Sequence, residues 1–192
     1  SRKDFSGSKI LPAISVTAFV FALQMINFSI PGTGSSGHIV GGILLAALLG
    51  PAAGFLAMCG ILLVQALFFA DGGLLALGCN IFNMGFLACF AAYPFIYKPL
   101  ADKNRPVLGA ILASVIALQL GSLAVVAEAW ISGSLTSHPA MFAGLMQGIH
   151  LAIGIVEGVF TGLVIALANK TELSKKFSYS LCGLSLILAG FI

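Results

Sequence analysis

One stretch near the start of the chain decides the fold: Ile10-Leu-Pro-Ala-Ile-Ser-Val-Thr-Ala-Phe-Val-Phe-Ala-Leu-Gln-Met-Ile-Asn-Phe28. These nineteen residues include no charged side chain. At about 1.5 Å of rise per residue, an α-helix of this length matches the thickness of the hydrocarbon core of a bilayer. The stretch therefore predicts a transmembrane helix.

The composition of the whole chain extends this prediction. Of the 192 residues, 59% are hydrophobic and 8% are charged, a balance that cannot cover a water-soluble domain with polar groups. Residues 10–97 carry one charge, Asp71, and residues 107–169 carry two, Glu128 and Glu157. Such tracts cross a bilayer as helices, because a helix satisfies its backbone hydrogen bonds within one segment. The sequence predicts an all-α, polytopic bundle of transmembrane helices.

Glycine, proline and charged residues divide the chain into spans. A Gly-Pro pair at 50–51 separates two apolar runs, which form either two packed helices or one kinked helix. We count six predicted spans in a single membrane domain, residues 1–192, and an apolar C-terminal tail that forms a partial or complete seventh. They are 10–28, 38–50, 52–70, 74–97, 107–132 and 140–168, with the tail at 178–192.

The basic residues predict the orientation of the bundle. All nine lie in three segments, the lead-in 1–9 and the loops 98–106 and 170–177. If residues 38–70 form two crossings, all three segments lie on one side, which the positive-inside rule makes cytoplasmic. The Gly-rich loop 29–37 is then on the outer face. Because the positive charges are split among these loops, the net charge of +3 is a topology signal, and we expect a lipid bilayer and no nucleic acid as partner.

A polar break follows the first span: Asn27-Phe-Ser-Ile-Pro-Gly-Thr-Gly-Ser-Ser-Gly-His38. Imidazole is a common ligand of nickel, cobalt, copper and zinc, and the glycines at 32, 34 and 37 allow the backbone to fold tightly around a small ion. The predicted topology puts this break where an external solute arrives. We therefore predict that His38 is a metal ligand.

The 140–168 span carries a stripe of polar and small residues at spacings of 3, 4, 3 and 4. Its members are Gln147, His150, Gly154, Glu157 and Thr161. They share one helical face, and that face must contact protein because polar groups are costly in lipid. His150 and Glu157 then either support or couple the metal site, or form a buried hydrogen-bonded pair that locks two helices together.

Two pairs of amides, each spaced i, i+3, lie near the predicted outer ends of spans. The pairs are Gln24 with Asn27 and Asn80 with Asn83. Each pair is expected to project from one helix face at a depth close to His38, where amides hold a ligand loop or orient an imidazole. Hydrogen bonding between helices explains them equally well. Asp71, before two glycines, is expected to be the N-cap of the following span.

Small residues four apart permit close helix contact. Ala18 and Ala22 form one such pair, and Gly50 and Gly54 form another. Each pair serves either packing within the bundle or contact with a partner membrane subunit. The cysteines have no C-x-x-C pair, and we expect them to pack in the core. They are Cys59, Cys79, Cys89 and Cys182.

Five blocks of sequence, in order over almost the whole chain, resemble the CbiM/NikM family of cobalt and nickel transport components. The first three are Ala18-Phe-Val-Phe-Ala-Leu-Gln-Met-Ile-Asn-Phe28, Pro31-Gly-Thr-Gly-Ser-Ser-Gly-His38 and the stretch from Gly41-Gly42 through Leu49-Gly-Pro51. The others are Gln65-Ala-Leu-Phe-Phe-Ala-Asp-Gly-Gly through Asn80-Ile-Phe-Asn-Met-Gly85 and Gly148-Ile-His-Leu-Ala-Ile-Gly-Ile-Val-Glu-Gly158.

The resemblance implies the substrate-capture (S) component of an energy-coupling factor transporter in a prokaryotic cell membrane. Such a component binds Ni(II) or Co(II) outside and delivers it inward when a transmembrane coupling (T) subunit and paired ATPases drive it to reorient. A small accessory membrane subunit is a further expected partner. The chain has no G-x-x-x-x-G-K-[ST] loop, so we expect ATP hydrolysis on separate subunits and no enzyme activity or cofactor here.

In that family, a chain that begins Met-His supplies a terminal amine, a backbone nitrogen and an imidazole, and a second histidine completes a planar nitrogen site. The matching second histidine here is His38. Ni(II) suits this set well and Co(II) less strictly, whereas magnesium and calcium prefer oxygen. Ser35 and Ser36 of the same loop join the amides, His150 and Glu157 as candidate support for the site.

The chain departs from the family pattern at its start, Ser1-Arg-Lys-Asp4, with no Met-His and no apolar span before Ile10. We expect that the sequence begins after the family's first helix, so that its bundle lacks that helix. Two other functions stay open. One is a vitamin-type S component or another small-solute transporter, which needs a larger apolar pocket with converging polar groups. The other is a non-transporting membrane assembly subunit.

Overall fold

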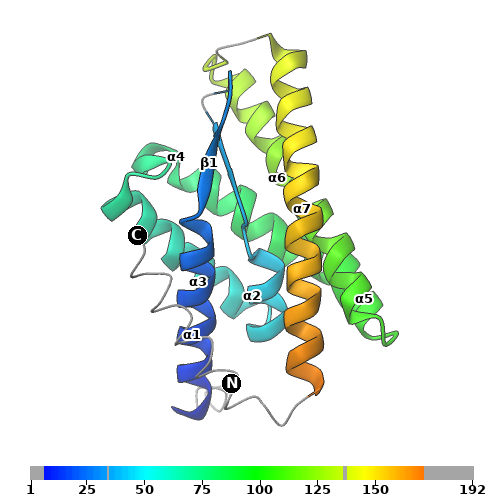
Figure 1. The fold of residues 1–192 in the computed structure, drawn as a ribbon. Coiled ribbons are helices and arrows are strands. Elements are labelled where there is room, and N and C mark those ends of the chain that lie inside the picture. The colour runs from blue at the N-terminus through cyan, green and yellow to red at the C-terminus, as the bar shows by residue number, and fades with distance from the viewer. Residues whose placement is uncertain (1–6, 34, 136–137, 171–192) are drawn as a thin grey trace.

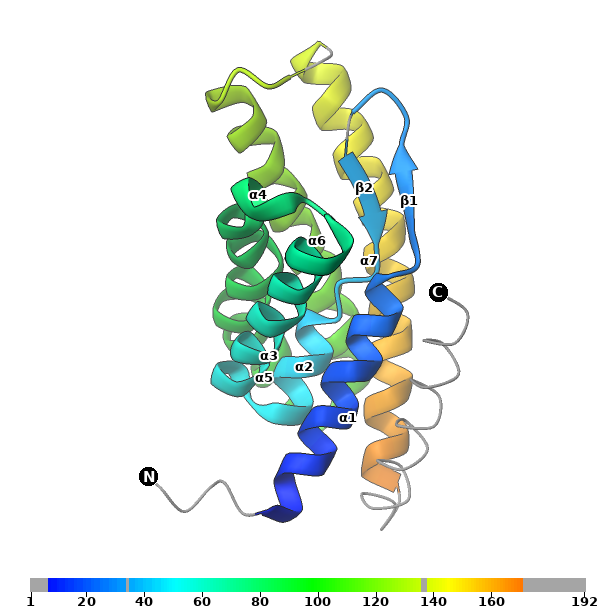
Figure 2. The ribbon, with the colours of Figure 1, turned by 90° about the vertical axis from the view of Figure 1, so that its left-hand side faces the viewer.

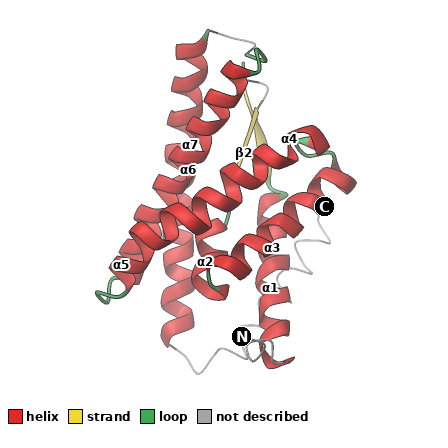
Figure 3. Ribbon diagram, turned by 180° about the vertical axis from the view of Figure 1, so that it is seen from behind, coloured by secondary structure: helices red, strands yellow, loops and turns green. Residues whose placement is uncertain are grey.

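The computed structural model describes residues 7–33, 35–135 and 138–170, and their regular structure is helical except for one β-hairpin (Figure 1, Figure 3). The helices are α1 (Gly7–Gln24), α2 (Gly42–Leu49), α3 (Pro51–Val64), α4 (Gly73–Asn80), α5 (Lys98–Ala101), α6 (Pro106–Ile131) and α7 (Pro139–Lys170), with the π-helices η1 (Gln65–Phe69) and η2 (Ile81–Tyr97). The strands are β1 (Asn27–Ile30) and β2 (Ser35–His38). The predicted helical class is confirmed, with the hairpin as an addition.

Four helical stretches are long and apolar enough to cross a membrane. They are Pro51–Phe69, Gly73–Ala101, Pro106–Ile131 and Pro139–Ala168. They match the last four predicted spans within a few residues, which confirms a multi-pass membrane protein. The predicted loop 170–177 beyond its first residue, the tail 178–192 and the first six residues of the lead-in 1–9 lie outside the described residues.

The first predicted span, 10–28, ends too late. Helix α1 stops at Gln24, and β1 begins at Asn27. The apolar part of α1 is therefore the shorter stretch Ile10–Gln24. Pairing with β2 displaces the helix here, because proline and glycine after Ile30 reverse the chain and bring a partner strand alongside.

The second predicted span, 38–50, is wrong as a single helix, since α2 has only eight residues. Gly41, with a φ of 72°, takes the left-handed conformation that glycine tolerates, and α2 starts only after it. Strand β2, the linker 39–41 and α2 together run from the hairpin back toward the end of the bundle where α1 begins (Figure 2). Gly50 then separates α2 from α3, so two helices follow and not one kinked helix.

The hairpin replaces the predicted outer loop 29–37. Its strands are antiparallel, and Asn27 lies opposite His38 in the register. The Thr33 hydroxyl closes the turn by donating a hydrogen bond to the Ile30 carbonyl oxygen at 2.8 Å. The hairpin thus places His38 at the base of a short, internally bonded element.

A small apolar cluster seats the hairpin on α7. Ile30, which is 2% exposed, packs with Phe142 and Met146 of that helix. The two strands accordingly lie alongside α7 (Figure 2). Because the Ile30 side chain is anchored in the bundle, the position of β2 is set by the bundle and not by the turn alone.

Helices α6 and α7 form the most extensive helix pair of the molecule (Figure 1). Their contact runs through glycines of α7. A Cβ added to Gly154 would lie 2.9 Å from the Cα of Val115, and one added to Gly158 would lie 2.6 Å from the Cα of Ile111. The stripe predicted on this helix therefore faces protein.

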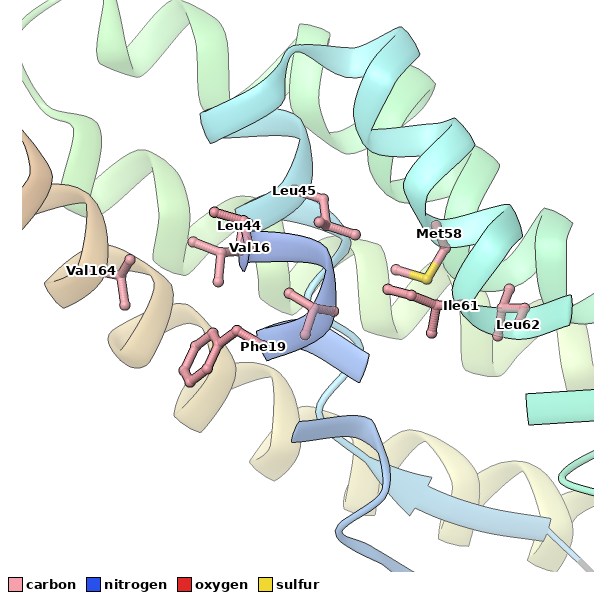
Figure 4. Packing of buried hydrophobic residues seen from close by; sticks show 9 residues of the cluster. Val16, Phe19, Leu44, Leu45, Met58, Ile61, Leu62 and Val164 are labelled. Carbon is pink, nitrogen blue, oxygen red and sulfur yellow. The ribbon is translucent and has the colours of Figure 1, made fainter. Parts of the chain in front are cut away.

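The main core lies where α1, α2, α3 and α7 meet (Figure 4). Its labelled members are Val16, Phe19, Leu44, Leu45, Met58, Ile61, Leu62 and Val164. Large apolar side chains also cover the outside of the spanning helices, among them Phe68 at 76% and Phe95 at 78% exposure. These helices are therefore apolar on their outward as well as their inward faces. Such an outer surface is stable where lipid surrounds it.

The two pairs of small residues differ in their surroundings. A Cβ on Gly54 of α3 would lie 2.8 Å from the Ala46 nitrogen of α2, so this glycine serves packing within the chain. Ala18 is exposed, whereas Ala22 is buried at 2% exposure. The burial of Ala22 favours the first of the two alternatives, packing within the bundle, for that residue.

Two expectations about single residues also change. Asp71 is not the N-cap of α4: the cap position is Gly72, with a φ of 68° and no side-chain hydrogen bond. Of the cysteines in the described part, Cys89 is buried, but Cys79 is exposed and does not pack in the core. Cys182 lies outside the described residues.

Candidate metal centre

A cavity of about 710 Å³ lies among the hairpin, α4, η2, α6 and α7. Most of the residues predicted for the site lie on its wall: Ser35, Ser36, His38, Asn80, Asn83, His150 and Glu157. They come from β2, from the consecutive helices α4 and η2, and from α7, three regions that are far apart in the sequence. The other two, Gln24 and Asn27, contact the segment that carries His38.

His38 is the last residue of β2 and is partly buried. Its Nδ1 lies 3.0 Å from the carbonyl oxygen of Ile39. This contact fits a proton on Nδ1, which leaves the Nε2 lone pair available to a metal ion.

The peptide of Val40, two residues after His38, is held from both sides. Its N–H donates to Oε2 of Glu157 on α7 at 2.6 Å. Its carbonyl oxygen accepts from Nε2 of Gln24 on α1, also at 2.6 Å. The linker has no secondary structure of its own at this point, so these side chains take the place of a helical or strand partner.

A second amide holds the first. Gln65 of η1 donates through Nε2 to Oε1 of Gln24 at 3.0 Å, and both side chains are buried, at 3% and 0% exposure. Gln24 Nε2 also lies 3.4 Å from the Met58 sulfur. Helices α1 and α7 thus bond to the linker after His38, and η1 supports the α1 contact. Asn27 has no such role, because it belongs to β1 and not to the face of α1.

The polar stripe of α7 divides into two parts. Gln147 donates to the Ser122 hydroxyl of α6 at 2.8 Å, whereas His150 lines the cavity and places Nδ1 2.8 Å from the Met146 carbonyl oxygen. No hydrogen bond joins His150 to Glu157 in the part of the chain that the structure describes, so the predicted locking pair is wrong. Both side chains line the cavity, but they do not bond to each other.

Sequence reasoning missed a contact on the other side of the cavity. Asn83 of η2 donates through Nδ2 to Oε2 of Glu128 on α6 at 2.9 Å. Gln65 and Asp71 also line the cavity without having been predicted there. A carboxylate in an otherwise uncharged span was the available signal for Glu128.

The described side chains alone do not complete a metal site. Within residues 7–33, 35–135 and 138–170, no three His, Cys, Asp or Glu side chains are grouped so that they could hold an ion. His38 and His150 supply two imidazoles to the same cavity. A transition metal would take further ligands from another segment, from water or from both.

Spanning helices around a polar cavity with imidazoles on its wall define the class: a multi-pass membrane protein with an internal site of solute size. The family model for CbiM, the cobalt uptake substrate-specific transmembrane region, matches residues 2–174. The chain belongs to this family, which confirms the resemblance seen in its sequence.

Individual relatives agree with the family. The chain is 39% identical over 160 residues to the cobalt transport protein CbiM of Acetoanaerobium sticklandii, with 78% of this chain and 63% of that protein covered. It is 34% identical over 168 residues to the fused nickel transport protein NikMN of Rhodobacter capsulatus, with 85% and 48% covered. A crystal structure of a transition metal transporter matches with a TM-score of 0.79 at 33% identity, over 94% of this chain and 86% of that one. The chain spans about half the length of several curated relatives.

Proposed function

We propose that this chain captures Ni(II) or Co(II) in the cavity beside the hairpin, as the substrate-specific component of a membrane transporter. The observation that carries the proposal is the convergence of His38 and His150 on one cavity in a chain of the cobalt-uptake family. The names of two relatives, one a cobalt and one a nickel transport protein, support the same pair of ions.

His38 is the ligand that we assign. Its Nδ1 contact with a backbone carbonyl fixes the ring, and the bonds to Val40 fix the backbone that follows it. Partners of this kind orient a ligand and raise its basicity. A nitrogen ligand favours Ni(II) and Co(II) over the harder magnesium and calcium ions.

The remaining ligands follow from the resemblance to CbiM/NikM proteins. There, a segment that starts Met-His contributes three nitrogens beside the matching histidine. The cavity, at about 710 Å³, is far larger than a single ion, and its size supports the presence of such a segment or of bound water around the metal.

Transport requires energy that this chain does not supply by itself. We propose that separate ATPases act through a transmembrane coupling subunit, with a small accessory membrane subunit as a further partner. Ala18 remains a candidate for such a contact, because it is exposed on α1.

A second candidate function rests on the volume of the cavity. About 710 Å³ falls within the range of roughly 300 to 1,000 Å³ that small organic ligands occupy. A vitamin-type S component or another small-solute transporter would use such a space. The size alone supports this alternative, whereas the two imidazoles support the metal.

Nickel binding by the full-length protein, measured by titration calorimetry in detergent, tests the proposal. The unmutated protein is expected to bind Ni²⁺, and His38→Ala is expected to weaken binding by about a hundredfold or more, because a ligand is lost. His138→Ala is the matched control, since that histidine is exposed and is not on the cavity wall. No nickel binding by the unmutated protein would contradict the metal function, and equal affinity in His38→Ala would remove His38 from the site.

A further inference from the structure

Carboxylates lie at the cavity, and the described basic side chains do not line it. Besides Glu157, which holds the Val40 peptide, two carboxylates of the described residues have no role in positioning His38. Asp71 lines the cavity from the turn between η1 and α4. Glu128 lies directly behind the wall, bonded to the lining residue Asn83. The lysine and arginine side chains that the structure describes, Lys98, Lys103 and Arg105, belong to α5 and the turn after it, at the far end of the bundle from the hairpin (Figure 1).

Asn83 supplies an independent sign that a ligand binds here. Its side chain is 5% exposed and lies on the cavity wall. Its Nδ2 is bonded to Glu128, which fixes the orientation of the amide. Its Oδ1 is buried and has no hydrogen-bond partner among the described residues. A buried acceptor without a partner is unfavourable, so a solute in the cavity is the natural source of the missing donor.

The chemistry of these groups points to a hydrated cation. Asp71, Asn83 and Glu128 offer oxygen atoms, which suit a divalent ion that retains its water. No described group of three acidic, histidine or cysteine side chains is placed to hold a bare ion. Water molecules on the ion can donate to Asn83 Oδ1, while the two carboxylates act through their charge.

We propose that Asp71, Asn83 and Glu128 form an acquisition site, which holds the hydrated divalent cation in the outer part of the cavity before it reaches His38. This inference rests on the proposed function and adds a step to it. Negative charge at the mouth of a low-dielectric cavity raises the local concentration of a cation and its rate of arrival. The nitrogen ligands on the same cavity wall then determine how tightly it stays.

The two roles separate kinetically. Charges along an approach path change the association rate and its salt dependence, whereas ligands change the dissociation rate. Nickel association is measured by stopped-flow mixing of the full-length protein with Ni²⁺ at several ionic strengths. Asp71→Asn and Glu128→Gln are each expected to slow association by about three- to tenfold at low salt and to leave dissociation unchanged. The difference is expected to shrink as salt rises.

Asp102→Asn is the matched control, because this exposed carboxylate pairs with Lys98 at 3.0 Å at the other end of the bundle. It is expected to keep the association rate of the unmutated protein. Glu128→Gln retains an acceptor for Asn83. Asp71 lies in a turn, so Asp71→Asn still tests the proposal if Glu128→Gln folds poorly.

The failure of this inference differs from the failure of the proposed function. If the unmutated protein binds no nickel, the proposed function is wrong. If it binds nickel and both Asp71→Asn and Glu128→Gln keep its association rate, the acquisition site is wrong and the metal function stands. An equal loss in Asp102→Asn would also overturn the site, because it would show an effect of net charge alone.

Discussion

The Val40 peptide is the point where distant parts of the chain meet the predicted ligand. Its N–H donates to the Glu157 carboxylate, and its carbonyl oxygen accepts from the Gln24 amide, each at 2.6 Å. A backbone group in an unwound linker within a membrane protein must find such partners, because lipid supplies none. We therefore propose Glu157 and Gln24 as positioning residues for His38.

The variants Glu157→Gln and Glu157→Ala are expected to differ in their stability and in their nickel affinity. Glutamine keeps an oxygen that accepts from the Val40 N–H, so stability and nickel affinity should change little. Alanine leaves that N–H without a partner, which costs about 1–3 kcal/mol of unfolding free energy. It should also weaken nickel binding by about tenfold or more, because the support of the ligand is lost.

Thermal unfolding in detergent and nickel calorimetry on the same preparations measure both effects. If Glu157→Ala loses stability but keeps its affinity, the carboxylate braces the fold without positioning His38.

The contact between α2 and α3 shows how short elements are held in the bundle. Helix α2 has only eight residues and would not be stable alone. It is buried because α3 approaches it closely at Gly54, where an added Cβ would meet the backbone of α2 at 2.8 Å. Close approach of this kind gives helices in membranes their packing contacts.

Gly54→Ala is therefore expected to destabilise the protein by about 1–3 kcal/mol, since neither backbone can move away easily. Gly60→Ala, on the same helix, is the matched control. A Cβ at Gly60 meets nothing within 4 Å, and alanine is the better helix former there by about 0.5–1 kcal/mol. Thermal unfolding of the two variants should thus shift in opposite directions. A shift of equal sign and size would contradict this account of the α2–α3 contact.

Element boundaries show where sequence patterns were sufficient. The four long spans were predicted within a few residues, because continuous apolar runs bounded by glycine, proline or charge have no other stable form in a bilayer. The hairpin was not predicted. Residues 27–30 extend an apolar helix in the sequence, and only their pairing with residues 35–38 and the burial of Ile30 against α7 make them a strand.

At the scale of the whole molecule, the two ends of the bundle differ in charge. The described basic side chains lie within residues 98–105, and the connection between α6 and α7 lies at the other end (Figure 1). The positive-inside rule makes the basic end cytoplasmic. We therefore expect the cavity with its carboxylates and imidazoles to face the outside, as capture of an external ion requires.

Labelling of cells with a membrane-impermeant thiol reagent measures this orientation. In a variant without native cysteines, Ser134→Cys is expected to react in intact cells, because residue 134 is exposed in the α6–α7 connection. Lys103→Cys is expected to react only after the membrane is opened. The reverse pattern would put the cavity on the cytoplasmic side and contradict capture from outside.

The sequence by itself determined the membrane class and the long spans. It also predicted the orientation of the basic loops and His38 as a candidate ligand. These properties depend on composition, run length and local spacing. The thickness of the bilayer sets the length of an apolar span, and the basic residues beside the spans set their orientation. The tertiary structure decided which polar residues share a cavity. Gln24 turned to the linker, Asn83 paired with Glu128, and His150 and Glu157 separated into independent lining residues. Such choices depend on contacts between residues up to 117 positions apart, which no local pattern contains.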